Sequence, residues 1–149
     1  MKNNIQEIAY ILQNKFLDEH FIVQRYDAKT TRSVYLKLDY GYANSIRISD
    51  HRGYDHLSYR YNVVIGLDKS YYKKDKKGFM RYYFTPDDID KLIDHVLVMR
   101  KNRIKEYGES KYSFYVQGYY NKYYDTQGFW KNCKQLRRFN TNGTKSTSE

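Results

Sequence analysis

The chain has few of the residues that build covalent or metal-linked frameworks. Its 149 residues include one cysteine, one proline and one tryptophan. A single thiol excludes an internal disulfide framework and a cysteine-cluster zinc site, and it indicates a reducing compartment. No apolar run approaches the roughly 18 residues that a membrane-spanning helix needs, and residues 1–7 lack the apolar core of a signal peptide. We therefore expect a soluble, cytoplasmic protein with the length of one domain.

Aromatic residues, in contrast, are abundant. The chain contains 19 Tyr and 7 Phe residues, and aromatics make up 18% of it. Disordered chains are poor in aromatic residues, so this composition predicts a folded protein. A tyrosine can bury its ring and leave its hydroxyl group in water, and we therefore expect an amphipathic surface.

The net charge of +10 is concentrated in the second half of the chain. Residues 1–68 contain nine Lys or Arg and eight Asp or Glu residues, whereas residues 69–149 contain 18 and nine. Clustered cations gain affinity for a phosphate backbone by releasing its counterions, so this asymmetry favours a polyanionic partner. The alternative is a solvated basic surface that reflects a compositional bias toward Lys, Asn and Tyr, and the sequence leaves both open.

Two amphipathic helices are predicted. The first covers residues 3–20, with Asn3 or Asn4 as its cap. The second begins at Thr85-Pro86 and ends at about Tyr107, before Gly108. In both, apolar residues recur at helical spacing, and these residues are Ile5, Ile8, Ala9, Leu12 and Phe16, then Ile89, Leu92, Ile93, Val96 and Ile104.

Between the helices, short β-prone runs predict strands. They lie at residues 21–26, 33–40, 46–49, 57–66 and 79–84, with a hairpin turn at 41–44 and a loop at 68–78. Val63, Val64 and Ile65 are consecutive, which is typical of a strand covered on both faces. After Gly108, residues 112–116 predict a short strand and then a mixed segment, although the spacing of the tyrosines also fits a helix.

This order predicts an α+β domain. Its antiparallel sheet would have about five strands, with the N-terminal and the later amphipathic helix packed on one face. Residues 1–108 would form the core. Residues 109–139 are a Tyr-rich, basic C-terminal extension, either part of the same domain or a recognition segment. Residues 140–149 contain no apolar side chain and predict a disordered tail.

A dense polar cluster follows the predicted hairpin, in the segment Ser49-Asp50-His51-Arg52-Gly53-Tyr54-Asp55-His56. Asp50, His51, Asp55 and His56 have side chains that bind divalent metals or act as acid/base pairs. Their spacing matches no helical or zinc-binding pattern, and a loop between strands is polar for structural reasons. A structural turn, a binding surface and a metal-dependent nuclease site remain alternatives, and we predict neither a bound metal nor a cofactor.

The run Ile46-Arg47-Ile48-Ser49-Asp50-His51 ends one of the predicted strands. It resembles the strand end of small bacteriophage and mobile-element proteins, some of which are anti-CRISPR or other anti-defence factors. The resemblance covers about six of the 149 residues. It implies a phage or mobile-element origin and a bacterial host, and it assigns no functional residues.

Basic and aromatic residues are interleaved in two segments, which is typical of proteins that bind single-stranded nucleic acid. There, cations contact phosphates and aromatic faces stack on unpaired bases. Tyr and Arg are also enriched at protein–protein interfaces, so the expected partner is a nucleic acid or a nucleic-acid-bound protein such as a CRISPR effector. The predicted binding residues, three of them on the second helix, are Lys69, Tyr71, Tyr72, Lys73, Lys74, Lys76, Lys77, Arg81, Arg100, Lys101, Arg103, Tyr119, Tyr120, Lys122, Tyr123, Tyr124, Trp130, Lys131, Arg137 and Arg138.

The familiar catalytic motifs are missing from the sequence. There is no phosphate-cradling glycine loop, no nucleophile elbow and no His-Glu-x-x-His motif. Cys133 lies among cations that lower a thiol pKa, but an inert thiol is the simpler interpretation. We therefore predict a non-enzymatic protein that binds a nucleic acid or a nucleoprotein machine, most concretely an anti-CRISPR inhibitor of a type II effector nuclease. The alternatives are the metal-dependent nuclease and a structural phage protein.

Overall fold

The computed structural model describes residues 4–50, 59–123 and 133–136, with the backbone alone for 119–123. Within these ranges a sheet of seven strands combines with three α-helices and two short 3-10 helices. In chain order these elements are α1 (Ile5–Asp18), β1 (Val23–Asp27), β2 (Val34–Leu38), η1 (Asp39–Gly41), β3 (Ser45–Ser49), β4 (Tyr61–Val64), β5 (Tyr71–Lys74), β6 (Met80–Phe84), η2 (Pro86–Asp88), α2 (Ile89–Tyr107), α3 (Glu109–Tyr123) and β7 (Lys134–Leu136).

The strands form one mixed sheet in the order β5-β6-β4-β3-β2-β1-β7. The predicted α+β class is confirmed, and so is the β2–β3 hairpin. The prediction of about five antiparallel strands is matched only roughly, because the β3–β4 and β4–β6 pairs are parallel and two further strands are present. Side chains alternate equally in parallel and antiparallel strands, so the sequence pattern did not report strand direction.

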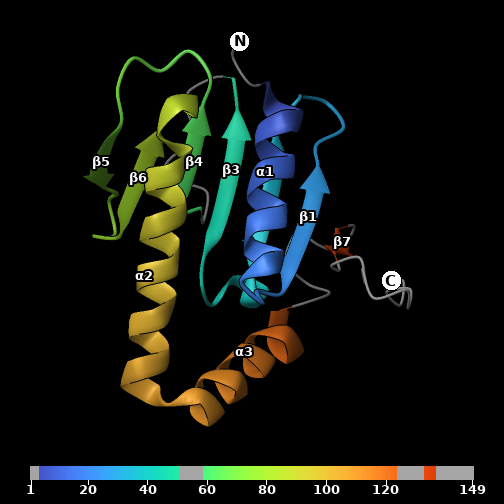
Figure 1. Ribbon diagram of the computed structural model, residues 1–149, viewed down its shortest axis with the longest axis vertical. Helices are drawn as coiled ribbons and strands as arrows, with labels where there is room; N and C mark the ends of the chain where they lie inside the picture. Colours follow the sequence, from blue (N-terminus) through green and yellow to red (C-terminus); the bar gives the residue numbers. More distant parts are fainter. Residues whose placement is uncertain (1–3, 51–58, 124–132, 137–149) are drawn as a thin grey trace.

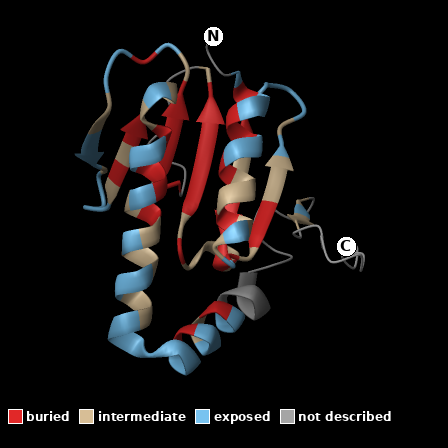
Figure 2. Cartoon of the chain, in the orientation of Figure 1, coloured by how far each residue is buried: buried red, intermediate tan, exposed pale blue. Residues whose placement is uncertain are grey.

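Helices α1 and α2 cover one face of the sheet (Figure 1). Their inward-facing side chains are buried and their outer faces are exposed (Figure 2). Asn4 caps α1 by accepting a hydrogen bond from the amide of Glu7, whose side chain in turn accepts from the Asn4 amide. Every predicted core residue of the two helices except Ile104 belongs to one apolar cluster with the strands: Ile5, Ile8, Ala9, Leu12, Phe16, Ile89, Leu92, Ile93 and Val96.

The opposite face of the sheet buries a group of polar side chains. Gln24, Lys37 and Ser45 lie side by side across β1, β2 and β3, and Arg47 and Asn62 across β3 and β4. Each of them is at most 7% exposed. Burial lowers the pKa of the Lys37 ammonium group to about 8. An antiparallel sheet with one covered face usually exposes the other to water, whereas here the central strands β3 and β4 are buried on both faces.

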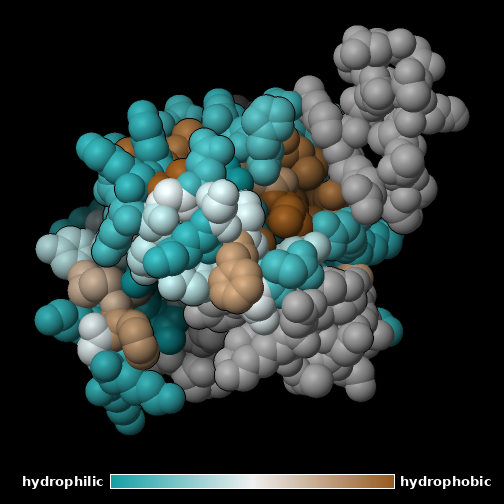
Figure 3. Space-filling view, turned by 90° about the horizontal axis from the view of Figure 1, so that it is seen from below, coloured by the Kyte–Doolittle hydropathy of each residue, from teal (hydrophilic) through white to brown (hydrophobic). Residues whose placement is uncertain are grey.

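Helix α3 corrects the prediction for the segment after Gly108. The strand expected at residues 112–116 is wrong, since these residues are helical. Tyr112 and Val116 are one helical turn apart and each is 5% exposed, so burial of one helical stripe outweighs the β propensity of the run. Gly108 ends α2 at a positive φ of 88°, as expected. From below (Figure 3), most of the described surface at this end is hydrophilic, with apolar side chains gathered in a smaller patch.

Strands β5 and β7 were not predicted. The segment 68–78, expected to be a loop, contains β5, which pairs with β6 at one edge of the sheet. β7 has three residues and pairs with β1 at the other edge. Both are edge strands with few buried side chains, and such strands lack the apolar alternation on which the prediction depended.

Candidate nucleic-acid interface

The β5–β6 hairpin carries most of the first predicted binding segment. Tyr71 pairs with Tyr83 and Lys73 with Arg81 in its register. Because side chains alternate between faces, Tyr72 and Lys74 lie on the same face as the helices, whereas Tyr71 and Lys73 lie on the other. Figure 1 shows β5 at the outer edge of the sheet. The hairpin therefore presents basic side chains on both faces and along an edge.

The turn of this hairpin is built around Asp75. One carboxylate oxygen accepts hydrogen bonds from the amides of Lys77 (2.9 Å) and Phe79 (3.0 Å). The other accepts from the Arg81 guanidinium at 2.8 and 3.1 Å. Burial alone would raise the pKa of Asp75, but these donors outweigh it and lower the pKa. Gly78 completes the turn at a φ of 89°, a conformation that favours glycine.

Because Asp75 is held by Arg81, its charge does not neutralise the neighbouring lysines. The side chains of Lys69, Lys73, Lys74, Lys76 and Lys77 are all exposed. Lys73 lies over the ring of Tyr83, 5.9 Å from its centroid. For the other four, no ion pair is found in the described part of the chain. Asp68 is the one exposed acid in the same segment.

Two exposed aromatic side chains lie among these lysines. Tyr72 is 65% exposed and Phe79 is 59% exposed. Tyr72 also packs at a tilt against Tyr82, with ring centroids 6.0 Å apart. In the sequence, Phe79 is typical of a strand residue and carries no further signal of a binding role. We use the name hairpin surface for Lys69, Tyr72, Lys73, Lys74, Lys76, Lys77 and Phe79.

Two other predicted residues of this segment contribute to the fold. Arg81 is 9% exposed and donates hydrogen bonds to Asp75 and to the carbonyl oxygen of Tyr59. Tyr71 stacks on Tyr83 with ring centroids 4.7 Å apart. Both side chains therefore stabilise the hairpin from the face that lies away from the helices, and we leave them out of the hairpin surface.

The predicted cations of α2 also have internal partners. Arg100 donates to the Asp39 carboxylate at 2.8 Å and to the carbonyl oxygens of Glu19 and His20, and it stacks on Phe21 at 4.0 Å. Arg103 donates to the carbonyl oxygen of Tyr42. Lys101 is exposed. Arg100 and Arg103 thus join α2 to the end of α1 and to the β2–β3 turn.

The second predicted segment is described only in part. Tyr119, Tyr120, Lys122 and Tyr123 lie in the last turns of α3, for which the backbone alone is described. The remaining predicted residues lie outside the described ranges, as does the predicted tail at 140–149: Tyr124, Trp130, Lys131, Arg137 and Arg138. The part of the second segment that the structure describes therefore lies on α3 and not on the β5–β6 hairpin.

Of the four potential metal ligands in the predicted polar cluster, the structure describes Asp50. Its carboxylate forms an ion pair with Arg32, directly after the end of β3. His51, Asp55 and His56 lie outside the described ranges. Among the residues that are described, no group of three or more His, Cys, Asp or Glu side chains is arranged to hold a metal ion.

Cys133 lies beside the polar face of the sheet. Gln24 donates a hydrogen bond to its sulfur atom at 3.4 Å. Burial raises the pKa of the thiol, and the nearby Lys37 ammonium only partly offsets it. A thiol that stays protonated is a poor nucleophile, which agrees with the inert interpretation.

Comparison of the chain with family models, with curated proteins and with solved structures finds no match. In the portion that the structure describes, no helix has both the length and the apolar character required to cross a membrane.

Proposed function

We propose that this protein binds a nucleic acid, free or within a nucleoprotein, through the hairpin surface. Five exposed lysines supply contacts to phosphates. Tyr72 and Phe79 supply faces on which unpaired bases stack. The combination favours single-stranded nucleic acid over duplex, because the bases of a duplex are already stacked.

One observation carries this proposal. The Asp75–Arg81 ion pair, with side chains 6% and 10% exposed, removes the central acid of the segment from the surface. The lysines on either side of it then give the hairpin exposed charges of one sign, on both faces and along its edge. A surface that served solubility alone would mix both signs.

The experiment is a titration of labelled single-stranded oligonucleotides, followed by fluorescence anisotropy at several salt concentrations. In the variant Lys73→Ala/Lys74→Ala/Lys76→Ala/Lys77→Ala, affinity should fall. The slope of log K against log salt should become shallower by about 0.7 for each phosphate that the variant no longer neutralises. The fold should be retained, because these side chains are exposed.

A matched control removes four exposed lysines elsewhere: Lys29→Ala, Lys91→Ala, Lys105→Ala and Lys111→Ala. It makes the same change in net charge, so a weakening that depends only on overall charge would be equal in both variants. An equal weakening, or no binding by the wild-type protein, would contradict the proposal. Metal-dependent cleavage of the oligonucleotide that disappears in Asp50→Asn would instead support the nuclease alternative.

In its most concrete form, the proposed partner is a type II CRISPR effector nuclease. The resemblance at residues 46–51 supports this setting, and such an effector has grooves that hold single-stranded nucleic acid. A cleavage assay with guide RNA and target DNA tests it. Inhibition by the wild-type protein, weakened in the four-lysine hairpin variant but not in its control, is the expected result. Full cleavage at saturating protein would reject this partner and leave the nucleic-acid proposal to the titration.

A further inference from the structure

A row of aromatic rings continues from the hairpin surface toward α2, on the face of the sheet that the helices cover. Tyr72 of β5 packs at a tilt of 42° against Tyr82 of β6, with ring centroids 6.0 Å apart. The Tyr82 ring in turn lies 4.3 Å from the ring of His95 on α2. Figure 1 shows α2 in front of this part of the sheet, with β5 at the outer edge. The row therefore begins on the hairpin surface and ends on a helix that this surface does not include.

The rings of this row keep accessible surface. Tyr72 is 65% exposed, and Tyr82 and His95 are half-buried. On the opposite face of the same two strands, Tyr71 is half-buried and stacks on Tyr83, which is 2% exposed. Unpaired bases stack on accessible aromatic faces. Of the two ring pairs of β5 and β6, the pair on the helix side therefore suits a base better.

The His95 ring is held in position by β4. Its Nδ1 atom lies 3.1 Å from the hydroxyl group of Tyr61. Tyr61 is fully buried, and its ring stacks on Tyr82 with centroids 5.7 Å apart. The two ring nitrogens of a histidine are distinct, and here Tyr61 engages one of them. A ligand would therefore contact His95 through its Nε2 atom or its ring face.

Cations lie at both ends of the row. Lys74 is exposed at the outer end, on the same face of β5 as Tyr72. Arg60 lies at the inner end, where burial lowers the pKa of His95 and the charge of Arg60 lowers it further. The titratable and charged groups that the described structure places around His95 are Tyr61, Tyr82 and Arg60, with Asp88 and Lys91 on the preceding turns.

The acids at the start of α2 do not crowd the row. Asp88 already accepts a hydrogen bond from the Ser70 hydroxyl group at 2.8 Å. Asp90 and Asp94 project about 100° or more away from His95, because successive residues of an α-helix are rotated by about 100°. These acids therefore repel a phosphate backbone at the rings less than their number suggests.

We propose that the strand bound by the hairpin surface continues along this row, so that one base stacks on Tyr72 and the strand contacts His95 at the inner end. The inference rests on the proposed function and extends its interface from the hairpin to α2. A phosphate near His95 favours the protonated ring, so binding is linked to the uptake of a proton. The complex should therefore be tighter at about pH 5.5 than at about pH 7.5.

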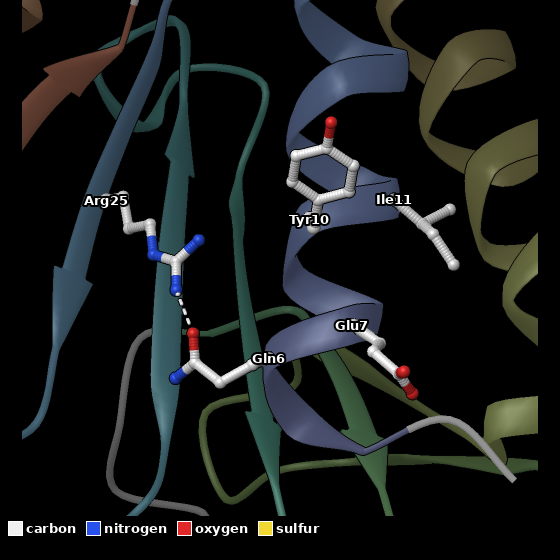
Figure 4. A pocket seen from close by; sticks show the side chains of 5 residues that line it. All are labelled: Gln6, Glu7, Tyr10, Ile11 and Arg25. Carbon is white, nitrogen blue, oxygen red and sulfur yellow. Dashed lines mark hydrogen bonds between the residues drawn. The ribbon is translucent and has the colours of Figure 1, made fainter.

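The first test repeats the anisotropy titration with Tyr72→Ala. Affinity should fall about 5- to 150-fold, as for the loss of one stacked base, and the salt slope should stay unchanged because every lysine is retained. Tyr10→Ala is the matched control, since Tyr10 is 62% exposed. Figure 4 shows Tyr10 on α1, beside a depression of about 510 Å³, and α1 lies over the other half of the sheet (Figure 1). This control should bind like the wild-type protein.

The second test measures affinity at about pH 7.5 and pH 5.5, on either side of the ordinary histidine pKa. Wild-type binding should strengthen about 3- to 10-fold on acidification, which corresponds to a His95 pKa that rises by up to about one pH unit in the complex. His95→Phe keeps a ring against Tyr82 and cannot take up a proton, so the gain should disappear. The control His20→Asn removes an exposed histidine and should keep the gain.

The outcomes separate this inference from the proposed function. If the wild-type protein binds no strand, both are wrong. If it binds and the four-lysine hairpin variant does not, the function holds and the path can be judged alone. The path is then wrong if Tyr72→Ala binds like Tyr10→Ala, or if the gain on acidification is absent or survives in His95→Phe. Weakening in Tyr72→Ala together with a gain that depends on His95 supports the path.

Discussion

Tyr112 of α3 donates a hydrogen bond of 2.5 Å to Asp39, a carboxylate that is 1% exposed after the end of β2. The same oxygen accepts from Arg100 of α2, and the other oxygen accepts from the amide of Ile22 at 2.9 Å. A buried carboxylate is stable only with such donors. This cluster therefore anchors α3, which begins the predicted extension, to the strands of the core.

Replacement of Tyr112 by Phe should destabilise the protein. It removes one donor from a buried charge, which costs about 1.5–3 kcal/mol. Urea unfolding measures the change as a lower midpoint with an unchanged slope. Phe114→Ala is the control on the same helix, because Phe114 is 72% exposed, and its effect should stay within about 0.5 kcal/mol. Equal effects of the two variants would mean that α3 is not anchored through Asp39.

His95 should make stability depend on pH below neutrality. Its Nδ1 atom lies 3.1 Å from the Tyr61 hydroxyl, and its ring packs against Tyr82 at 4.3 Å. Burial and the charge of Arg60 lower its pKa below 6.5. The unfolded chain therefore takes up a proton that the folded protein resists, and the free energy of unfolding should fall as pH drops through 6.5.

The variant His95→Phe keeps a ring against Tyr82 and cannot be protonated. Its free energy of unfolding should change less between about pH 7.5 and 5.5 than that of the wild type, because this range spans the ordinary histidine pKa. Denaturant unfolding at each pH gives both curves. Parallel curves would show that His95 does not cause the dependence.

Lys37 should produce the same trend at alkaline pH. Burial lowers its pKa to about 8, below the usual 10.5. Between these values the unfolded chain binds the proton and the folded protein does not, so the free energy of unfolding should rise with pH. The raised pKa of the Cys133 thiol acts against this in the same range. The comparison is therefore made in a Cys133→Ala background, where Lys37→Met should abolish the rise; a rise that persists would contradict the assignment.

Phe79 should contribute stacking and not charge. Phe79→Ala should weaken binding of a single strand about 5- to 150-fold, the range that corresponds to one stacked base. It should leave the salt slope unchanged, because every lysine that neutralises a phosphate is still present. Phe114→Ala again serves as the control. A change in slope, or a weakening equal to that of the control, would remove Phe79 from the interface.

Local patterns predicted the parts of this fold that depend on local chemistry. Spacing placed the buried faces of α1 and α2. Of the three consecutive apolar residues at 63–65, Val63 and Val64 are buried as expected, at 0% and 2% exposure, whereas Ile65 follows the strand and is half-buried. Strand direction at β3 and β4 was not predictable, since it depends on the path of the connection. The strand β5 was missed because two of its four residues are lysines and none of its side chains is fully buried, so it lacks the apolar alternation of a core strand.

The sequence predicted which kinds of residue make up the candidate site, but not which of these residues remain available for binding. Charge and aromatic content identified the segment at residues 69–81. Which cations remain available depends on pairings that composition does not show: Arg81 pairs with Asp75 of the same hairpin, and Arg100 with Asp39, 61 residues away in sequence.

The measurement that tests the central claim most directly is a map of backbone amide shifts during titration with a short single-stranded oligonucleotide. The largest shifts should fall on residues 69–79, in and beside β5, and they should diminish as salt increases. In the four-lysine hairpin variant these shifts should disappear. Shifts that leave residues 69–79 unaffected while other residues respond, or no shifts at all, would contradict the assignment of this surface to nucleic-acid binding.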